Sequence, residues 1–218
     1  MQSAKLQKDL YSLDEGVAMV KSSASAKFDE SIELHVKLGI DPKKSEQTVR
    51  GTCILPHGTG KKLKIAVFTE SKTNEAKEAG AELIGGKELV EEIGKTSKIA
   101  FDVALATPDF MRELSKIAKL LGPKGLMPSP KIGTLTDDLA GSIKNLKSGQ
   151  VSFRNDNTGN VHQIIGKASW DSAKLKENAA ALLSQVKKLR PKGIKGSFIE
   201  RATLSSTMGP GIPISTTA

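Results

Sequence analysis

The sequence contains a single cysteine, Cys53, among its 218 residues. One thiol excludes an intramolecular disulfide and any thiolate cluster that would hold zinc. No apolar run approaches the roughly 20 residues that a helix needs to span a bilayer. Residues 1–6 lack the apolar segment of a secretory signal. We therefore expect a protein of a reducing compartment, the cytosol or an organelle matrix, with no membrane partner.

The motifs of the common nucleotide-dependent enzymes are also missing. No G-x-G-x-x-G fingerprint occurs. The segment 58–61 has only part of a phosphate-binding loop, because Leu55 stands where a glycine is required and Lys62 where serine or threonine is required. We therefore expect no catalytic residues and no cofactor. An α/β enzyme that uses the middle of the chain is the alternative, and a protein-binding adaptor is a third interpretation.

Histidines are few, and they lie far apart in the sequence. None of His35, His57 and His162 has a metal-ligating spacing such as H-E-x-x-H. His35 and His162 lie on predicted strands of the two flanking regions, so their rings could approach each other. We favour polar residues of a strand face over a metal site or an acid–base pair, and we predict no metal ion.

The charge that is present is mostly positive. The formal net charge is +9 and the pI is about 9.5, which favours a polyanionic partner because neutralising phosphates releases counterions. Residues 1–60 hold 8 Lys+Arg and 8 Asp+Glu, whereas residues 151–218 hold 10 and 4. The C-terminal region is therefore the expected anion-facing part. A solvated helix end over residues 187–192 is the alternative, because cations there also favour the helix dipole.

Both ends of the chain have the pattern of an antiparallel α+β fold. Ser12-Leu13-Asp14-Glu15 is a capping box that starts a helix reaching about Ser23. Alternating apolar and polar residues predict a strand over Ile32–Leu38. The other expected elements are a strand over 48–55, a hairpin of strands 151–153 and 161–165 around a turn at 155–159, a helix over 172–189 and a strand over 198–204.

The middle of the chain alternates between strands and helices, which indicates a parallel sheet with helices on its faces. The economical interpretation is therefore a discontinuous domain of residues 1–60 and 151–218, with a second domain, residues 61–150, inserted into it. The expected strands of the middle are 63–68, 82–84 and 101–106, and the expected helices are 74–79, 87–93 and one from Thr107-Pro108 to Gly122.

Two segments near the chain ends carry side chains suited to RNA. Lys27 could meet a phosphate, Phe28 could stack on a base or ribose, and Ser31 could bond a 2′-hydroxyl. Residues 205–210 add hydroxyls, the flexible thioether of Met208 and a glycine that permits close backbone approach. A core anchor at Phe28 and a plain polar loop at 205–210 are the alternatives.

A proline- and glycine-rich loop over residues 121–131 offers a second nucleic-acid contact. Residues 114–136 contain four lysines and no acidic residue, so the loop is rigid and cationic. A simple connector is the alternative. The lysines are Lys116, Lys119, Lys124 and Lys131.

Nine motifs follow one another over almost the whole chain. They are Lys27-Phe28-Asp29-Glu30, residues 37–42, Val49-Arg50-Gly51-Thr52, Leu55-Pro56-His57-Gly58, Ala106-Thr107-Pro108-Asp109, the 121–130 loop, Phe153-Arg154-Asn155-Asp156, Gly166-Lys167-Ala168-Ser169 and Thr207-Met208-Gly209-Pro210. Together they resemble the stalk protein of the large ribosomal subunit, the family counted as that subunit's first protein, in its bacterial or organellar branch.

The resemblance implies a fold, a function and a site. It implies an α+β RNA-binding domain from both chain ends and an inserted three-layer, Rossmann-like α/β domain. The implied protein is a non-enzymatic constituent of the cytoplasmic ribosome and a monomer when free. It binds 23S-type ribosomal RNA at the mobile stalk, assists release of deacylated exit-site tRNA and represses translation through its own mRNA. The implied RNA surface comprises Lys27, Phe28, Ser31, Asp156, Thr158, His162, Lys167, Thr207, Met208 and Gly209.

Overall fold

The computed structural model describes residues 10–216, except 62, 71, 97 and 195. The segment inspected for a secretory signal, residues 1–6, lies outside the described residues. The chain divides into two compact units, one made of Met1–Gly60 with Ser148–Ala218 and the other of Lys61–Lys147. Across the described part of the chain, no helix is long and apolar enough to cross a membrane.

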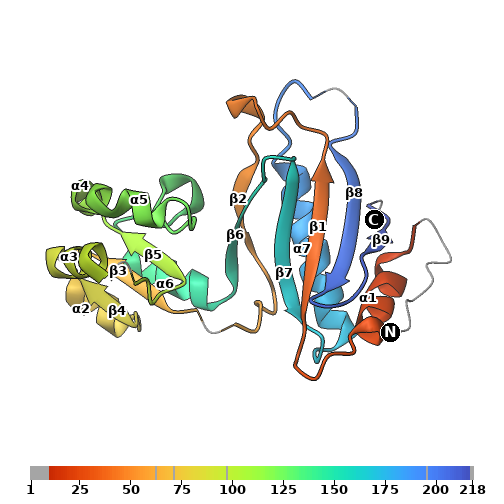
Figure 1. Ribbon diagram of the computed structural model, residues 1–218, viewed down its shortest axis with the longest axis horizontal. Coiled ribbons are helices and arrows are strands. Elements are labelled where there is room, and N and C mark those ends of the chain that lie inside the picture. Colours follow the sequence, from red (N-terminus) through yellow and green to blue (C-terminus); the bar gives the residue numbers. More distant parts are fainter. Residues whose placement is uncertain (1–9, 62, 71, 97, 195, 217–218) are drawn as a thin grey trace. The chain divides into compact units, whose positions relative to one another are not determined.

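The first unit is built on a four-stranded antiparallel sheet with strand order β7-β1-β8-β9 (Figure 1). Alternate residues of β1 are buried, as the period-two pattern predicts. The predicted strand over Ile32–Leu38 is therefore confirmed, whereas β9 was not anticipated from the sequence. The strands are β1 (Ser31–Leu38), β7 (Asn160–Lys167), β8 (Ile199–Ser206) and β9 (Ile212–Ile214).

Helices α1 (Leu13–Ser23) and α7 (Ser172–Lys188) pack on one face of this sheet and leave the other open (Figure 1). The predicted capping box of α1 is confirmed: the Glu15 amide donates to Ser12 Oγ, and the Ser12 amide donates to Glu15 Oε2. The buried side chains of β1 and of the two helices belong to one continuous apolar core. The polar half of β1 is thereby left on the open face.

A separate two-stranded sheet joins β2 (Arg50–Ile54) to β6 (Gln150–Arg154). The predicted hairpin of strands 151–153 and 161–165 is therefore wrong, because β7 pairs with β1 and only an isolated bridge connects Asn155 with Val161. Asn155, directly after β6, is bonded to Val49, directly before β2. Its side-chain carbonyl accepts the Val49 amide at 2.8 Å, and its backbone amide donates to the Val49 carbonyl. These two hydrogen bonds continue the β2–β6 pairing past the end of β6.

The second unit holds a three-stranded parallel sheet with order β4-β3-β5. Buried residues of β3 alternate between two apolar clusters, one on each face of this sheet. The mixed α/β class expected for the middle is confirmed. The elements are β3 (Ile65–Phe68), α2 (Thr73–Glu78), β4 (Leu83–Gly85), α3 (Lys87–Thr96), β5 (Val103–Ala106), α4 (Met111–Leu114), α5 (Ala118–Leu121) and α6 (Leu139–Lys147), with short 3-10 helices over Pro108–Phe110, Ser115–Ile117 and Pro130–Ile132. A further 3-10 helix, Ser45–Gln47, belongs to the first unit.

The helix expected from Thr107-Pro108 to Gly122 is broken into α4, α5 and two 3-10 segments. Ser115 lies at the break, and its hydroxyl donates to the Arg112 carbonyl at 2.6 Å. A serine side chain that bonds nearby backbone competes with the regular helical ladder. Helix α6 was not anticipated from the sequence.

Candidate nucleic-acid interface

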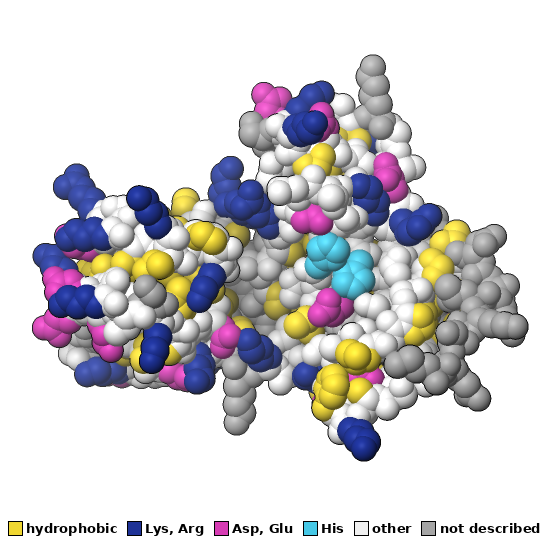
Figure 2. All heavy atoms as spheres, in the orientation of Figure 1, with side chains coloured by type: hydrophobic (Ala, Val, Ile, Leu, Met, Phe, Trp, Pro, Cys, Tyr) yellow, Lys and Arg dark blue, Asp and Glu magenta, His cyan; other side chains and the backbone are white. Residues whose placement is uncertain are grey.

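The open face of the four-stranded sheet carries polar side chains along β1, where Ser31, Glu33, His35 and Lys37 alternate with the buried residues. Figure 2 shows this face, with two histidine side chains beside each other near acidic ones and exposed hydrophobic side chains toward the lower end. Most of the site residues named from the sequence lie on this face or at its ends.

Two large apolar side chains are exposed where β1 begins and β8 ends. Phe28 is 56% exposed and Met208 is 71% exposed. The alternative in which Phe28 is a core anchor is therefore wrong. Phe28 precedes and Met208 follows the same register pair of β1 and β8, Ile32 with Ser206, and exposed apolar surface at one place is typical of a binding surface.

A buried carboxylate holds these two segments together. Glu30 is only 1% exposed; its Oε1 accepts the Ala26 amide at 2.9 Å and its Oε2 accepts the Met208 amide at 3.0 Å. The N–H groups of Ala26 and Met208 hold the pKa of the Glu30 carboxyl below its ordinary value. Glu30 therefore stays charged under the surface and ties the chain before β1 to the chain after β8.

Hydroxyl and ammonium groups border the apolar pair. The Ser31 amide donates to Thr207 Oγ1 at 3.0 Å, and Lys167 Nζ donates to Ser31 Oγ at 2.9 Å. Lys27 is exposed beside them in the sequence. The end of the sheet thus combines two hydroxyls and two cations with the exposed ring and thioether.

Gly209 and Asp29 fix the backbone of this end. A Cβ atom on Gly209 would lie 2.4 Å from Ser206 Oγ and 3.2 Å from Ser23 Oγ, so a larger residue would require the Ser206 side chain to shift. The Asp29 carboxylate accepts from the Ser169 amide at 3.1 Å and from the Ser169 hydroxyl at 2.9 Å. The three segments that meet here come from β1, β7 and β8.

The turn before β7 is organised by one carboxylate. Asp156 Oδ1 accepts the amides of Thr158 and Asn160, both at 2.8 Å, and the Thr158 hydroxyl at 2.8 Å. Partial burial acts against the charged form of Asp156. The Asn160 amide and the Thr158 hydroxyl and amide nevertheless hold its pKa well below the usual range. Lys37 Nζ donates to the Thr158 carbonyl at 2.5 Å, which fixes the turn against β1.

The ten predicted site residues therefore form two groups. One group is gathered at the start of β1, and the other lies toward the opposite end, since Ser31 pairs with Lys167 and Lys37 pairs with Asn160 in the β1–β7 register. The first group is Lys27, Phe28, Ser31, Lys167, Thr207, Met208 and Gly209, and the second is Asp156, Thr158 and His162.

Sequence reasoning assigned no role to Glu30, Asp29 or His35. Two adjacent carboxylates directly before an alternating strand are the one available signal for Asp29 and Glu30, but nothing in the sequence says which is buried. His35 directly faces His162 in the register. Within the described residues, no group of three or more His, Cys, Asp or Glu side chains could hold a metal ion.

Comparison with known proteins matches this chain to one family. The model of the Ribosomal protein L1p/L10e family matches residues 20–210. The protein named Large ribosomal subunit protein uL1 in Kosmotoga olearia is 54% identical over 205 residues, which cover 94% of this chain and 88% of that protein. The proteins of the same name in Thermosipho africanus and Fervidobacterium nodosum are 51% and 50% identical over 205 residues, with 94% of this chain and 88% and 87% of those proteins covered.

Proposed function

Because the chain belongs to the Ribosomal protein L1p/L10e family, we propose that it grips a folded segment of 23S-type ribosomal RNA through the end of the sheet that carries Phe28 and Met208. The protein is a structural constituent of the large ribosomal subunit, it acts at the cytoplasmic ribosome and it is not an enzyme. The RNA segment, the residues that bind it and the regulatory roles below belong to the proposal.

The observation that carries the proposal is the pair of exposed apolar side chains anchored by the buried Glu30 carboxylate. An exposed ring can stack on a base or ribose, and hydroxyls such as Thr207 Oγ1 can bond a 2′-hydroxyl or a phosphate. A charged carboxylate that holds the backbone beneath them makes the surface rigid before RNA arrives, which reduces the entropy lost on binding.

We assign RNA binding to the discontinuous unit, residues 1–60 and 148–218, and an inserted Rossmann-like domain to residues 61–147. The chain returns from the inserted unit to the discontinuous unit between residues 147 and 148. The boundary expected from the sequence lies between residues 150 and 151. The surface with Phe28 and Met208 belongs entirely to the discontinuous unit, which supports the assignment of RNA binding to this unit.

Two further roles, repression of translation and release of exit-site tRNA, extend the proposal. A copy of the ribosomal RNA segment in the protein's own mRNA would bind the same surface, and occupancy there would repress translation. The exit-site tRNA would meet the inserted domain, where Lys119, Lys124 and Lys131 are exposed around the 121–131 loop. This second surface would then assist release of deacylated tRNA. We further propose that the protein is a monomer when free.

Binding of a large-subunit RNA fragment by the variant Met208→Asp tests the surface. A carboxylate placed against RNA should lower the affinity by about 100-fold or more, while the melting temperature stays near that of the wild type because Met208 is exposed. Ile54→Asp is the matched control, since Ile54 is 57% exposed and lies on β2. Wild-type affinity in Met208→Asp would remove Met208 from the interface.

A further inference from the structure

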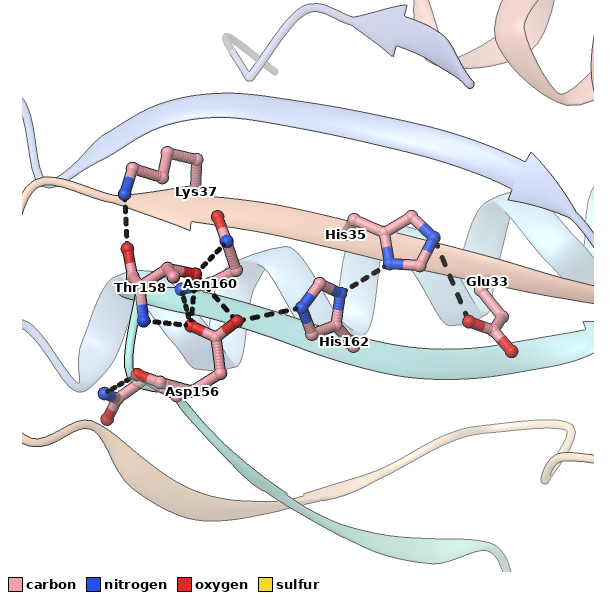
Figure 3. Close-up of polar contacts among 8 residues, drawn as sticks. Glu33, His35, Lys37, Asp156, Thr158, Asn160 and His162 are labelled. Carbon is pink, nitrogen blue, oxygen red and sulfur yellow. Dashed lines mark hydrogen bonds and ion pairs between the residues drawn. The ribbon is translucent and has the colours of Figure 1, made fainter. Parts of the chain in front are cut away.

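Two histidine rings meet at the centre of the open face. His35 on β1 and His162 on β7 are register partners, and their Nδ1 atoms are 2.8 Å apart. The ring centroids are 4.9 Å apart, with the rings edge to face. Figure 3 shows the pair in a row of polar contacts that runs from Glu33 through the two rings to Asp156 and the turn. Nothing in the proposed function uses His35.

The contacts of His162 fix the position of its proton. Its Nε2 faces Asp156 Oδ2 at 3.4 Å, and an ionised carboxylate can only accept, so this nitrogen carries hydrogen. In the neutral ring Nδ1 is then a lone pair. The 2.8 Å contact therefore requires His35 to donate through its own Nδ1.

The remaining nitrogen of His35 completes a directed chain. With Nδ1 protonated, a neutral His35 has a lone pair on Nε2, which lies 2.9 Å from the Ser205 hydroxyl. Ser205 donates to His35, His35 donates to His162, and His162 donates to Asp156. Each group in this neutral chain has a partner, so no ring needs a charge to satisfy its contacts.

The same geometry admits one added proton and disfavours a second. The first goes to His35 Nε2, where the Ser205 hydroxyl can turn to accept it and Glu33 Oε2 lies 3.9 Å away. A second would place hydrogen on both Nδ1 atoms, which face each other at 2.8 Å. The geometry therefore admits one added proton for the two rings together.

The charges around the pair set its state in the free protein. Burial lowers the pKa of His35 and the neighbouring His162 lowers it further, while Glu33 opposes both effects. Glu33 Oε2 lies 3.9 Å from His35 Nε2, and Asp156 Oδ2 lies 3.4 Å from His162 Nε2. Lys37 lies two residues further along β1, and Arg201 on β8 is its register partner. His35 is consequently mostly neutral near neutral pH in the free protein, and added negative charge on this face would favour its protonated form.

We propose that the His35–His162 pair takes up one proton when an RNA phosphate docks on the open face, so that RNA binding by this protein is linked to pH. The inference rests on the proposed function, and it adds His35 as a residue that positions and charges His162. Lower pH favours the protonated pair, so the RNA affinity rises as the pH falls. One shared proton limits the change to about tenfold per pH unit.

RNA affinity measured at constant ionic strength between about pH 6 and about pH 8 tests the linkage. The variant His35→Asn keeps a donor near the Nδ1 position and removes the ring nitrogen, Nε2, that takes up the proton. Wild type should gain affinity as the pH falls, and His35→Asn should show a flat profile. His57→Gln is the control, because His57 bonds Glu177 instead, and it should keep the wild-type profile.

Several outcomes would overturn the linkage alone. Identical pH profiles for wild type and His35→Asn would do so, as would imidazole ¹⁵N spectra in which both rings of the complex carry two protons. Wild-type RNA binding that is tight but independent of pH would also refute the linkage and leave the proposed function standing. Absence of RNA binding at every pH would instead refute the proposed function.

Discussion

At the scale of single residues, the surface at the start of β1 depends on a side chain that no ligand would touch. Both oxygens of the buried Glu30 carboxylate accept a backbone amide, one from Ala26 and one from Met208. Charge-assisted hydrogen bonds of this kind are about twice as strong as neutral ones. The positions of Phe28 and Met208 therefore depend on a charge beneath them.

Glu30→Gln tests this dependence. Gln offers one carbonyl oxygen, so one of the two amides must face an NH₂ group and stay unsatisfied. The free energy of unfolding should fall by about 1–3 kcal/mol, and RNA affinity should fall by about tenfold. Chemical denaturation and RNA titration measure the two effects.

A double-mutant cycle separates positioning from plain loss of stability. In the Glu30→Gln background, Met208→Ala should cost less RNA affinity than it does in the wild type, because Met208 is already displaced. Glu46→Gln, the same change at an exposed carboxylate, should leave affinity and stability unchanged. Additive effects of the Glu30 and Met208 changes would contradict the positioning role.

The site residues were only partly predictable. Phe28 and Met208 could be named because an aromatic ring and a thioether stand out in polar segments of the sequence. Glu30 could not be distinguished from Asp29, since burial depends on a chain segment 178 residues away. The contact of His35 with His162 could not be predicted with certainty for the same reason, because neither strand's own residues determine the register in which β1 and β7 pair.

At the scale of the elements, local signals were reliable and pairing was not. The capping box and the alternation of β1 are properties of a few adjacent residues, and both appear as expected. The β6–β7 hairpin failed because β6 has a better partner in β2, about 100 residues earlier in the chain. The three-residue strand β9 was not anticipated, because so short a segment carries weak periodicity. Helix α6 was missed although Leu139, Ile143 and Leu146 are buried at helical spacing.

Ser12→Ala tests the contribution of the capping box to α1. The Glu15 amide would lose its side-chain acceptor, and the free energy of unfolding should fall by about 1 kcal/mol. Thermal denaturation followed by circular dichroism measures the change. Ser22→Ala near the end of the same helix is the control, since it leaves the cap intact. Equal effects of the two changes would show that the cap adds nothing specific.

At the scale of the whole molecule, the chain leaves and re-enters the discontinuous unit at neighbouring points. The Leu55 amide donates to the Gly149 carbonyl at 3.1 Å. A Cβ atom on Gly149 would lie 2.6 Å from the Cα of Gly58, and Gly149 has a φ of 102°, which favours glycine. The ends of β2 and β6 are thus held together whatever the intervening residues do.

A variant in which a short glycine linker replaces residues 61–147 should fold cooperatively and bind the RNA fragment with near wild-type affinity. The expectation follows because the two cut ends are adjacent and the discontinuous unit has its own core. Circular dichroism and RNA titration are the measurements. A molten product, or a folded one that ignores RNA, would contradict the assignment of RNA binding to this unit.

The strand order β7-β1-β8-β9 also has a consequence for the time at which the surface comes into existence. Strand β1 is synthesised before its neighbour β8 and before the Thr207-Met208 segment, because Met208 follows Glu30 by 178 residues. Until then one edge of β1 is unpaired, and Glu30 lacks the Met208 amide that completes its contacts. A nascent chain therefore cannot complete this surface before Met208 has been synthesised, and RNA recognition through the proposed surface would begin only after that point.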